Sequence, residues 1–175
     1  MHDEYKSLLF ALMRKIIIGV MGPGAGAKAT ELAYAYELGL LIGQQGWVLL
    51  TGGRNMGVMD AASLGAKAVN GLTIGILPTD DTSAISSSVD IAIITDMGNA
   101  RNNINVLSSD VVIACGMGAG TASEIALALK QNRKVILLND NEESKCFFKN
   151  ISPQNVYIVD SPSKAIKIVK SCLVI

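Results

Sequence analysis

The stretch KIIIGVMGPGAGAKATELAYAYELGLLIGQQGWVLLTGG (residues 15–53) contains a complete structural unit. It starts with an unbroken apolar run at 15–21, which is typical of a strand covered on both faces. A turn with three glycines follows, then a segment of helical length at 27–46 and a second apolar run at 47–50. Strand, glycine turn, helix and strand in this order predict a parallel βαβ unit.

The same order repeats along the rest of the chain. Further apolar runs rich in Ile, Val and Leu lie at 72–77, 91–95, 110–115, 134–138 and 156–159. Segments of helical length lie at 57–70, 98–109, 120–132 and 161–173. The pattern predicts a Rossmann-like α/β fold: a doubly wound, mainly parallel sheet of about seven strands, buried on both faces and flanked by helices.

Length and composition favour a single domain. A chain of 175 residues is within the usual range of one compact domain, so we expect a single Rossmann-like domain over 1–175. Within it we expect a leading helix at 1–14, a sheet core at 15–160 and a C-terminal helix at 161–175. The 15 basic and 15 acidic side chains are dispersed and cancel, which disfavours nucleic acid as a partner.

Cysteine use and hydropathy indicate a cytoplasmic protein. The three cysteines, Cys115, Cys146 and Cys172, are odd in number and form no CxxC motif, so neither a metal site nor a disulfide framework is expected. The longest apolar region, 32–50, is interrupted by Glu37 and by glycines, which is unlike a membrane span.

Glycine turns follow three of the expected strands. They are GPGAG at 22–26, GGRNMG at 52–57 and GMGAG at 116–120. The carboxyl ends of parallel strands share one edge of a sheet, so the turns are expected to meet in one crevice. Glycine backbones leave room for a ligand, and the helix starts that follow offer free N–H groups to an anion. An anion-binding site is therefore predicted there.

Three charged side chains accompany these turns. Arg54 lies in the second turn and Arg101 near the start of the helix after 91–95; each is either a ligand-binding cation or an ordinary surface arginine. Glu124 either acts as an acid or base on a ligand or caps the helix, and its position three residues after Thr121, the spacing of a capping box, favours the cap.

The connection TDDTSAISSSVD at 79–90 carries no helical periodicity. Its Ser, Thr and Asp content predicts a loop. It is either a lid near the site or a solvated connector, and the sequence leaves both open.

Four segments resemble the molybdenum cofactor carrier proteins of algae and cyanobacteria. They are IGVMGPG, GWVLLTGGRNMGVMDAASLGAKAVNGLTIGILP, SSVDIAIITDMGNARNNINVLSSD and GMGAGTASEIALALKQNRKVILL, at 18–24, 46–78, 87–110 and 116–138. The resemblance implies non-catalytic binding, protection and transfer of the molybdenum cofactor (Mo-molybdopterin). It also implies recipient molybdenum enzymes or cofactor-biosynthesis proteins as partners, and a homo-oligomer, dimer or tetramer.

Residues of all three turns, with those that flank them, make up the cofactor-binding set that we expect. They are Gly22, Pro23, Gly24, Gly52, Gly53, Arg54, Asn55, Gly57, Asn99, Arg101, Gly116, Met117, Gly118, Gly120, Thr121 and Glu124. No dedicated metal ligands are expected, because the molybdenum arrives bound to the pterin sulfurs.

A more distant similarity is to the Lonely Guy phosphoribohydrolases, once labelled lysine decarboxylase-like. Their PGGxGTxxE pattern falls on residues 116–124, where Thr121 and Glu124 match, while Met117 replaces a glycine and Gly116 the proline. Their catalytic Arg-Lys pair falls on Arg101 and Asn102, so the lysine is lost. Two alternatives therefore remain: a nucleoside 5′-monophosphate phosphoribohydrolase using Arg101 and Glu124, or a nucleotide-sensing domain.

Overall fold

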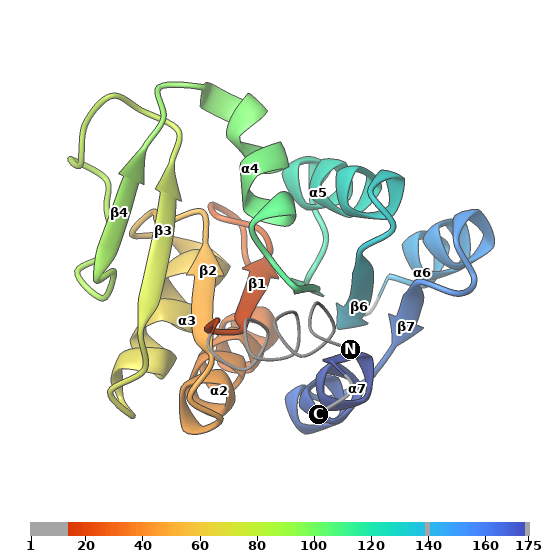
Figure 1. The fold of residues 1–175 in the computed structure, drawn as a ribbon. Coiled ribbons are helices and arrows are strands. Elements are labelled where there is room, and N and C mark those ends of the chain that lie inside the picture. Colours follow the sequence, from red (N-terminus) through yellow and green to blue (C-terminus); the bar gives the residue numbers. More distant parts are fainter. Residues whose placement is uncertain (1–13, 139–140, 174–175) are drawn as a thin grey trace, which may run out of the picture.

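The computed structural model describes residues 14–138 and 141–173. The leading helix expected at 1–14 lies outside the described residues except for Arg14. Seven strands form one sheet (Figure 1): β1 (Ile17–Met21), β2 (Val48–Thr51), β3 (Thr73–Leu77), β4 (Ile91–Ile94), β5 (Val111–Cys115), β6 (Lys134–Leu138) and β7 (Val156–Ile158).

Every pair of neighbouring strands runs parallel, in the order β4-β3-β2-β1-β5-β6-β7. The predicted doubly wound α/β fold is confirmed. The chain proceeds outward from β1 in one direction as far as β4, then returns to the other side of β1 as β5. The switch point therefore lies between β1 and β5, and ligands of such sheets bind beyond the carboxyl ends of the strands at that point.

Helices cover both faces of the sheet (Figure 1). They are α2 (Ala29–Gln44), α3 (Gly57–Lys67), the 3₁₀ turn η1 (Gly98–Arg101), α4 (Asn102–Leu107), α5 (Ala119–Lys130), α6 (Glu142–Ile151) and α7 (Pro162–Leu173). Helix α6 is missing from the sequence-based expectations. Its sequence EESKCFFKNI is polar overall, and its few apolar residues lie on one face of the helix. Asn141 caps it by accepting a hydrogen bond from the Ser144 N–H at 2.7 Å.

Alternate strand residues fill two separate cores. Ile18 and Val20 of β1 pack with α2, α3 and α7 on one face, whereas Met21 packs with α4, α5 and α6 on the other. The side chains of β5 alternate between the cores in the same way, with Ile113 in the first core and Val112 in the second. Burial on both faces explains why the central strands carry continuous apolar runs.

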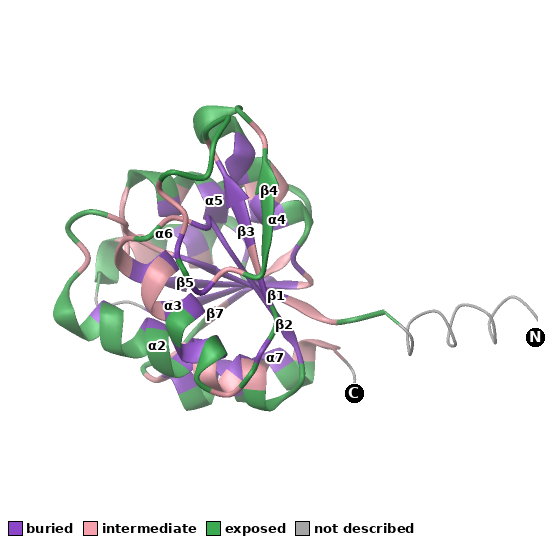
Figure 2. Ribbon diagram, turned by 90° about the vertical axis from the view of Figure 1, so that its left-hand side faces the viewer, coloured by how far each residue is buried: buried purple, intermediate pink, exposed green. Residues whose placement is uncertain are grey.

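Strand β4 departs from that rule. All four of its residues are exposed, although the sequence predicted a strand covered on both faces. Figure 2 shows β4 exposed at the rim of the sheet. The physical reason is the connection 79–90, which contains no helix that would cover this edge, while α4 is only six residues long.

The 79–90 connection is fastened to the second glycine turn. The Asn55 N–H donates to the Ala84 carbonyl at 2.8 Å, and the Ser86 N–H donates to the Gly53 carbonyl at 2.9 Å. Ser86 itself is buried. The 79–90 connection therefore supports the second glycine turn, which contains Arg54.

Candidate functional site

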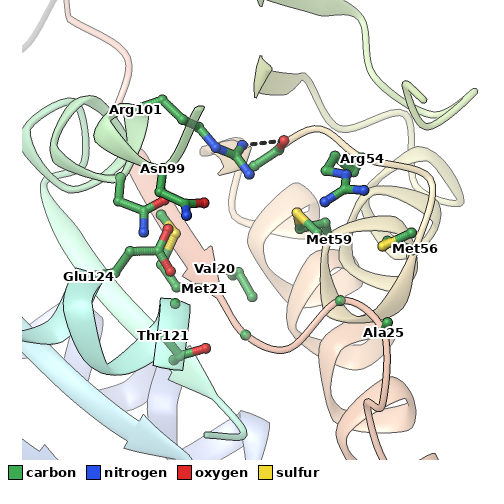
Figure 3. Close-up of a pocket in the computed structure, with 15 residues that line it drawn as sticks. Val20, Met21, Ala25, Arg54, Met56, Met59, Asn99, Arg101, Thr121 and Glu124 are labelled. Atoms are coloured by element: carbon green, nitrogen blue, oxygen red, sulfur yellow. Dashed lines mark hydrogen bonds between the residues drawn. The ribbon is translucent and has the colours of Figure 1, made fainter. Parts of the chain in front are cut away.

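The three glycine turns meet in one pocket of about 320 Å³ (Figure 3). It opens beyond the carboxyl ends of β1 and β2, beside the switch point. The pocket is lined by Val20, Met21, Gly22, Gly24, Ala25, Gly52, Arg54, Met56, Met59, Asn99, Arg101, Asn102, Gly120, Thr121 and Glu124. Its volume is in the range of small-molecule sites.

Nine of the sixteen residues proposed from the sequence line this pocket: Gly22, Gly24, Gly52, Arg54, Asn99, Arg101, Gly120, Thr121 and Glu124. The other seven do not: Pro23, Gly53, Asn55, Gly57, Gly116, Met117 and Gly118. Some of these hold the turns together instead. The Pro23 carbonyl accepts a hydrogen bond from the Val58 N–H at 3.0 Å, which joins the first turn to the start of α3.

Sequence reasoning missed six lining residues: Val20, Met21, Ala25, Met56, Met59 and Asn102. The three methionines bring polarizable thioethers to the pocket wall, which suits a flat or sulfur-containing guest. A signal was present, because Met56 and Met59 are three apart at a helix start and so share one side of it. Asn102 donates through Nδ2 to Ser123 Oγ at 2.9 Å and thereby joins α4 to α5.

Arg101 lines the pocket as a cation and also holds two parts of the backbone together. Its Nη1 donates to the carbonyl oxygen of Gly52 (Figure 3) and to that of Ile76, so it ties the second turn to β3. The residue is buried, and its Nε has no hydrogen-bond partner among the described residues. Burial lowers the pKa of Arg101, Glu124 opposes that effect and Arg54 adds to it; the guanidinium nevertheless stays charged.

Arg54 is a cation of the site whose side chain is available to a ligand. Its backbone forms an isolated bridge with Ile85, but its half-buried guanidinium makes no hydrogen bond or ion pair with any described residue. Figure 3 shows it beside Met56 and Met59, across the pocket from Glu124. An arginine with free donors at the wall of a pocket suits a bidentate anion such as a phosphate.

The capping-box prediction for Glu124 is wrong. Helix α5 begins at Ala119 with Gly118 as the N-cap, one turn earlier than the Thr121–Glu124 spacing implied. Glu124 instead lines the pocket, and its Oε1 accepts a hydrogen bond from Asn105 Nδ2 at 2.8 Å. Burial raises the pKa of Glu124 to about 7, against the opposing effects of the Asn105 hydrogen bond and the Arg101 charge.

This raised pKa predicts a pH-dependent penalty on folding. Between pH 4.5 and 7 the folded chain holds a proton on Glu124 that the unfolded chain has released, so stability falls as the pH rises through that window. Glu124→Gln removes the penalty, worth at most about 3 kcal/mol above pH 7 at 1.36 kcal/mol per pKa unit. Denaturant unfolding at pH 5 and pH 8 measures it. If the free energy of unfolding of Glu124→Gln differs from that of wild type by the same amount at pH 5 and pH 8, the raised pKa of Glu124 is contradicted.

Three buried polar atoms around the pocket lack a hydrogen-bond partner among the residues that the structure describes. They are Arg101 Nε, Asn105 Oδ1 and Thr121 Oγ1. Buried polar groups are nearly always hydrogen-bonded, so unpaired atoms clustered at one place indicate a missing polar partner. Thr121 and Arg101 line the pocket directly, which points to a ligand there.

Cys115 is a packing residue. It is fully buried at the end of β5, and its Sγ lies 3.4 Å from the Glu31 carbonyl oxygen. Burial, with the nearby Glu31 charge, raises the pKa of its thiol to about 12. A thiol with this pKa is no nucleophile at neutral pH.

Within residues 14–138 and 141–173, no three His, Cys, Asp or Glu side chains are grouped so that they could hold a metal ion. The same part of the chain has no helix with the length and apolar character needed to cross a membrane.

Comparison with known proteins identifies the family. A family model, the SLOG cluster4 family, matches residues 15–166. The chain belongs to the SLOG cluster4 family. A relative of unknown function from Archaeoglobus fulgidus is 46% identical over 126 residues, which cover 72% of this chain and 82% of that protein. Residues 15–166, the range that the family model matches, include all seven strands and the whole pocket.

Two solved structures resemble this SLOG cluster4 member over almost its full length. The molybdenum cofactor binding protein from the phototrophic bacterium Rippkaea orientalis is 63% identical, with a TM-score of 0.90 and coverage of 91% of this chain and 98% of that one. The Moco carrier protein of Chlamydomonas reinhardtii is 51% identical, with a TM-score of 0.88 and coverage of 92% and 99%. The resemblance to molybdenum cofactor carrier proteins is confirmed.

The more distant relationship is also present. A cytokinin riboside 5′-monophosphate phosphoribohydrolase from Mycobacterium tuberculosis is 32% identical over 110 residues, covering 62% of this chain and 59% of that protein.

Proposed function

We propose that this protein binds the molybdenum cofactor, shields it and passes it on without altering it. The observation that carries the proposal is the pocket. It is lined by Arg54, whose guanidinium has no hydrogen bond or ion pair among the described residues, and by Arg101 and Thr121, each of which keeps a buried polar atom without a partner there. The proteins of similar sequence and structure from Rippkaea and Chlamydomonas, described as cofactor-binding and carrier proteins, support it.

The residues present suit this cargo. The cofactor combines a pterin, a dithiolene that holds oxidised molybdenum, and a terminal phosphate. Arg54 offers the phosphate two donors, and the first N–H groups of α5 near Gly120 favour an anion. The thioethers of Met21, Met56 and Met59 supply an apolar wall for the pterin. We keep the seven predicted residues outside the pocket as supports of the three turns.

Anaerobic purification tests this proposal. The protein is expected to retain a molecule that gives pterin fluorescence after oxidation, and to restore activity to a molybdenum enzyme that lacks its cofactor. Protein that carries no pterin, and fails to reconstitute such an enzyme after loading, would contradict the proposal. By the same argument we propose cytoplasmic molybdenum enzymes or cofactor-biosynthesis proteins as its partners.

We further propose a homo-oligomer built on β4. The strand lies at the sheet edge with its outer backbone groups unpaired by any described strand, and Ile91, Ile93 and Ile94 are 44%, 41% and 50% exposed. Unpaired backbone groups at a sheet edge can form hydrogen bonds with another strand. A second copy presents the same apolar strand, so it satisfies both the backbone groups and the isoleucines.

Ile93→Lys is therefore expected to shift the protein toward the mass of a single chain in light scattering after size exclusion. A lysine there stays hydrated and disfavours burial of the edge. The matched control is Ile151→Lys, because Ile151 on α6 is also exposed, at 57%, but distant from β4. An unchanged mass for Ile93→Lys would exclude this interface.

An enzyme remains the second candidate, because Glu124 and Arg101 share the pocket and the pKa of Glu124 suits acid–base chemistry near neutral pH. A phosphoribohydrolase would release free adenine from AMP, and Glu124→Ala would abolish the release. Absence of adenine after prolonged incubation would contradict the phosphoribohydrolase proposal and leave the carrier proposal standing.

A further inference from the structure

Glu124 occupies an unusual position for a carboxylate, since it faces a pocket that otherwise favours anions. Figure 3 shows Glu124 and Thr121 on one side of the cavity and Arg54 on the other. A charged carboxylate here would repel an anionic ligand. A neutral carboxylic acid would instead offer that ligand a hydrogen-bond donor.

The surroundings of Glu124 leave its charge largely uncompensated. The positive charge of Arg101 of η1 lowers the pKa of Glu124, but it does not outweigh burial. The Nη1 of Arg101 is already bound to two backbone carbonyl oxygens. Helix α4 contributes only the neutral Asn102 and Asn105, and β1 contributes Val20 and Met21. Arg54 is the other charged residue among those that line the pocket.

One carboxyl oxygen of Glu124 is free to carry a proton. Oε1 accepts the hydrogen bond from Asn105 Nδ2, whereas Oε2 has no partner among the described residues. The residue is only 7% exposed, and burial of an unpaired charge is costly, so the neutral form is favoured. A proton on Oε2 turns an acceptor into a donor at the pocket wall.

We propose that Glu124 binds the anionic cargo as a neutral carboxylic acid, donating through Oε2–H, so that ligand binding takes up a proton from solution. The inference rests on the proposed function, because it requires an anion in this pocket. No covalent bond forms or breaks; the proton comes from water or buffer and returns there when the ligand leaves.

The direction of the pH dependence follows. Below pH 7 Glu124 already carries its proton, so binding there takes up little. Above pH 7 the empty site has lost the proton and must regain it, which weakens binding up to tenfold per pH unit. The cargo phosphate titrates in the same range, with a second pKa of about 6. The contribution of Glu124 is therefore the difference between wild type and Glu124→Gln, which keeps the shape and a donor but cannot titrate.

Calorimetry under anaerobic conditions tests the proposal, with molybdenum cofactor released from a purified molybdenum enzyme as the probe. Titrations at pH 6, 7 and 8, each in two buffers of different ionisation enthalpy, give both the affinity and the number of protons taken up. At pH 8 the wild type is expected to take up about one proton more than Glu124→Gln, and its affinity relative to the variant to fall by about fivefold between pH 7 and 8.

A matched control is Glu31→Gln, because Glu31 is another buried carboxyl, 8% exposed, that does not line the pocket. It is expected to follow the wild-type pH dependence. Equal proton uptake by wild type and Glu124→Gln, with clear binding at pH 6, would overturn this inference and leave the proposed function intact. No binding at any pH would overturn both.

Discussion

Arg54→Ala is expected to weaken binding of the molybdenum cofactor by about 10- to 100-fold, because a charged hydrogen-bonding group contributes about 1.5–3 kcal/mol and each 1.4 kcal/mol is tenfold. The guanidinium faces the pocket without a hydrogen bond or ion pair to any described residue. Its removal therefore leaves the fold intact, and the unfolding midpoint is expected to stay within error of wild type.

The measurement is pterin retained per chain after anaerobic purification and gel filtration. Lys170→Ala is the matched control, since it also removes one positive charge, from the exposed face of α7. Wild-type retention by Arg54→Ala would mean that the cargo binds elsewhere. Equal losses in both variants would mean that net charge, and not this arginine, governs binding.

Among the glycines that line the pocket, Gly22 is expected to tolerate an added methyl group least, and Gly22→Ala to destabilise the fold by about 3 kcal/mol or more through overpacking. A Cβ on Gly22 would collide with the Cys115 carbonyl oxygen at the end of β5, and would lie 2.7 Å from both methyl carbons of Val58. Backbone cannot yield as a flexible side chain can, so the first turn would be forced away from the end of β5.

Gly120→Ala provides the comparison for folding. A Cβ at Gly120 meets no atom within 4 Å, and alanine favours the helix in which it lies. Its unfolding free energy is expected to equal or exceed that of wild type, while that of Gly22→Ala falls. Equal stability of the two variants would show that close approach of the turns is not what shapes the pocket.

The central strands could be predicted from the sequence because their burial is uniform. Continuous apolar runs marked β1, β5 and β6 to within two residues, and the β6 run at 134–138 matches its strand completely. The same reasoning misjudged β4, whose apolar run looks identical but faces no helix. An apolar run shows that a strand has side chains that could be buried, but it does not show whether a helix covers them.

The convergence of the glycine turns was also predictable, because it follows from parallel strands and connectivity alone. Side-chain roles were less accessible. The Thr121–Glu124 spacing fits a capping box, yet α5 begins three residues earlier because Gly118 takes the extended N-cap conformation. Once Thr121 lies inside the helix, Glu124 turns toward the pocket. A spacing rule cannot find that role without the true start of the helix.

Gly116, at the start of the third turn, is another residue whose role could not be predicted from the sequence. Gly116 adopts a φ of +83°, and a side chain there would strike the Glu31 carboxylate. This glycine therefore serves close packing of the turn against α2 and not the pocket. Glycines that admit a ligand and glycines that admit another part of the protein are indistinguishable in a sequence.

Anomalous diffraction at the molybdenum edge, from crystals grown anaerobically with the cofactor, tests the central claim most directly. The account predicts a single molybdenum peak inside the pocket lined by Arg54, Thr121 and Glu124. A second cavity of about 380 Å³, lined by Thr30, Tyr34 and Lys145 among others, provides the contrast. A peak there, or at the surface, with the pocket of the three turns empty, would contradict the account.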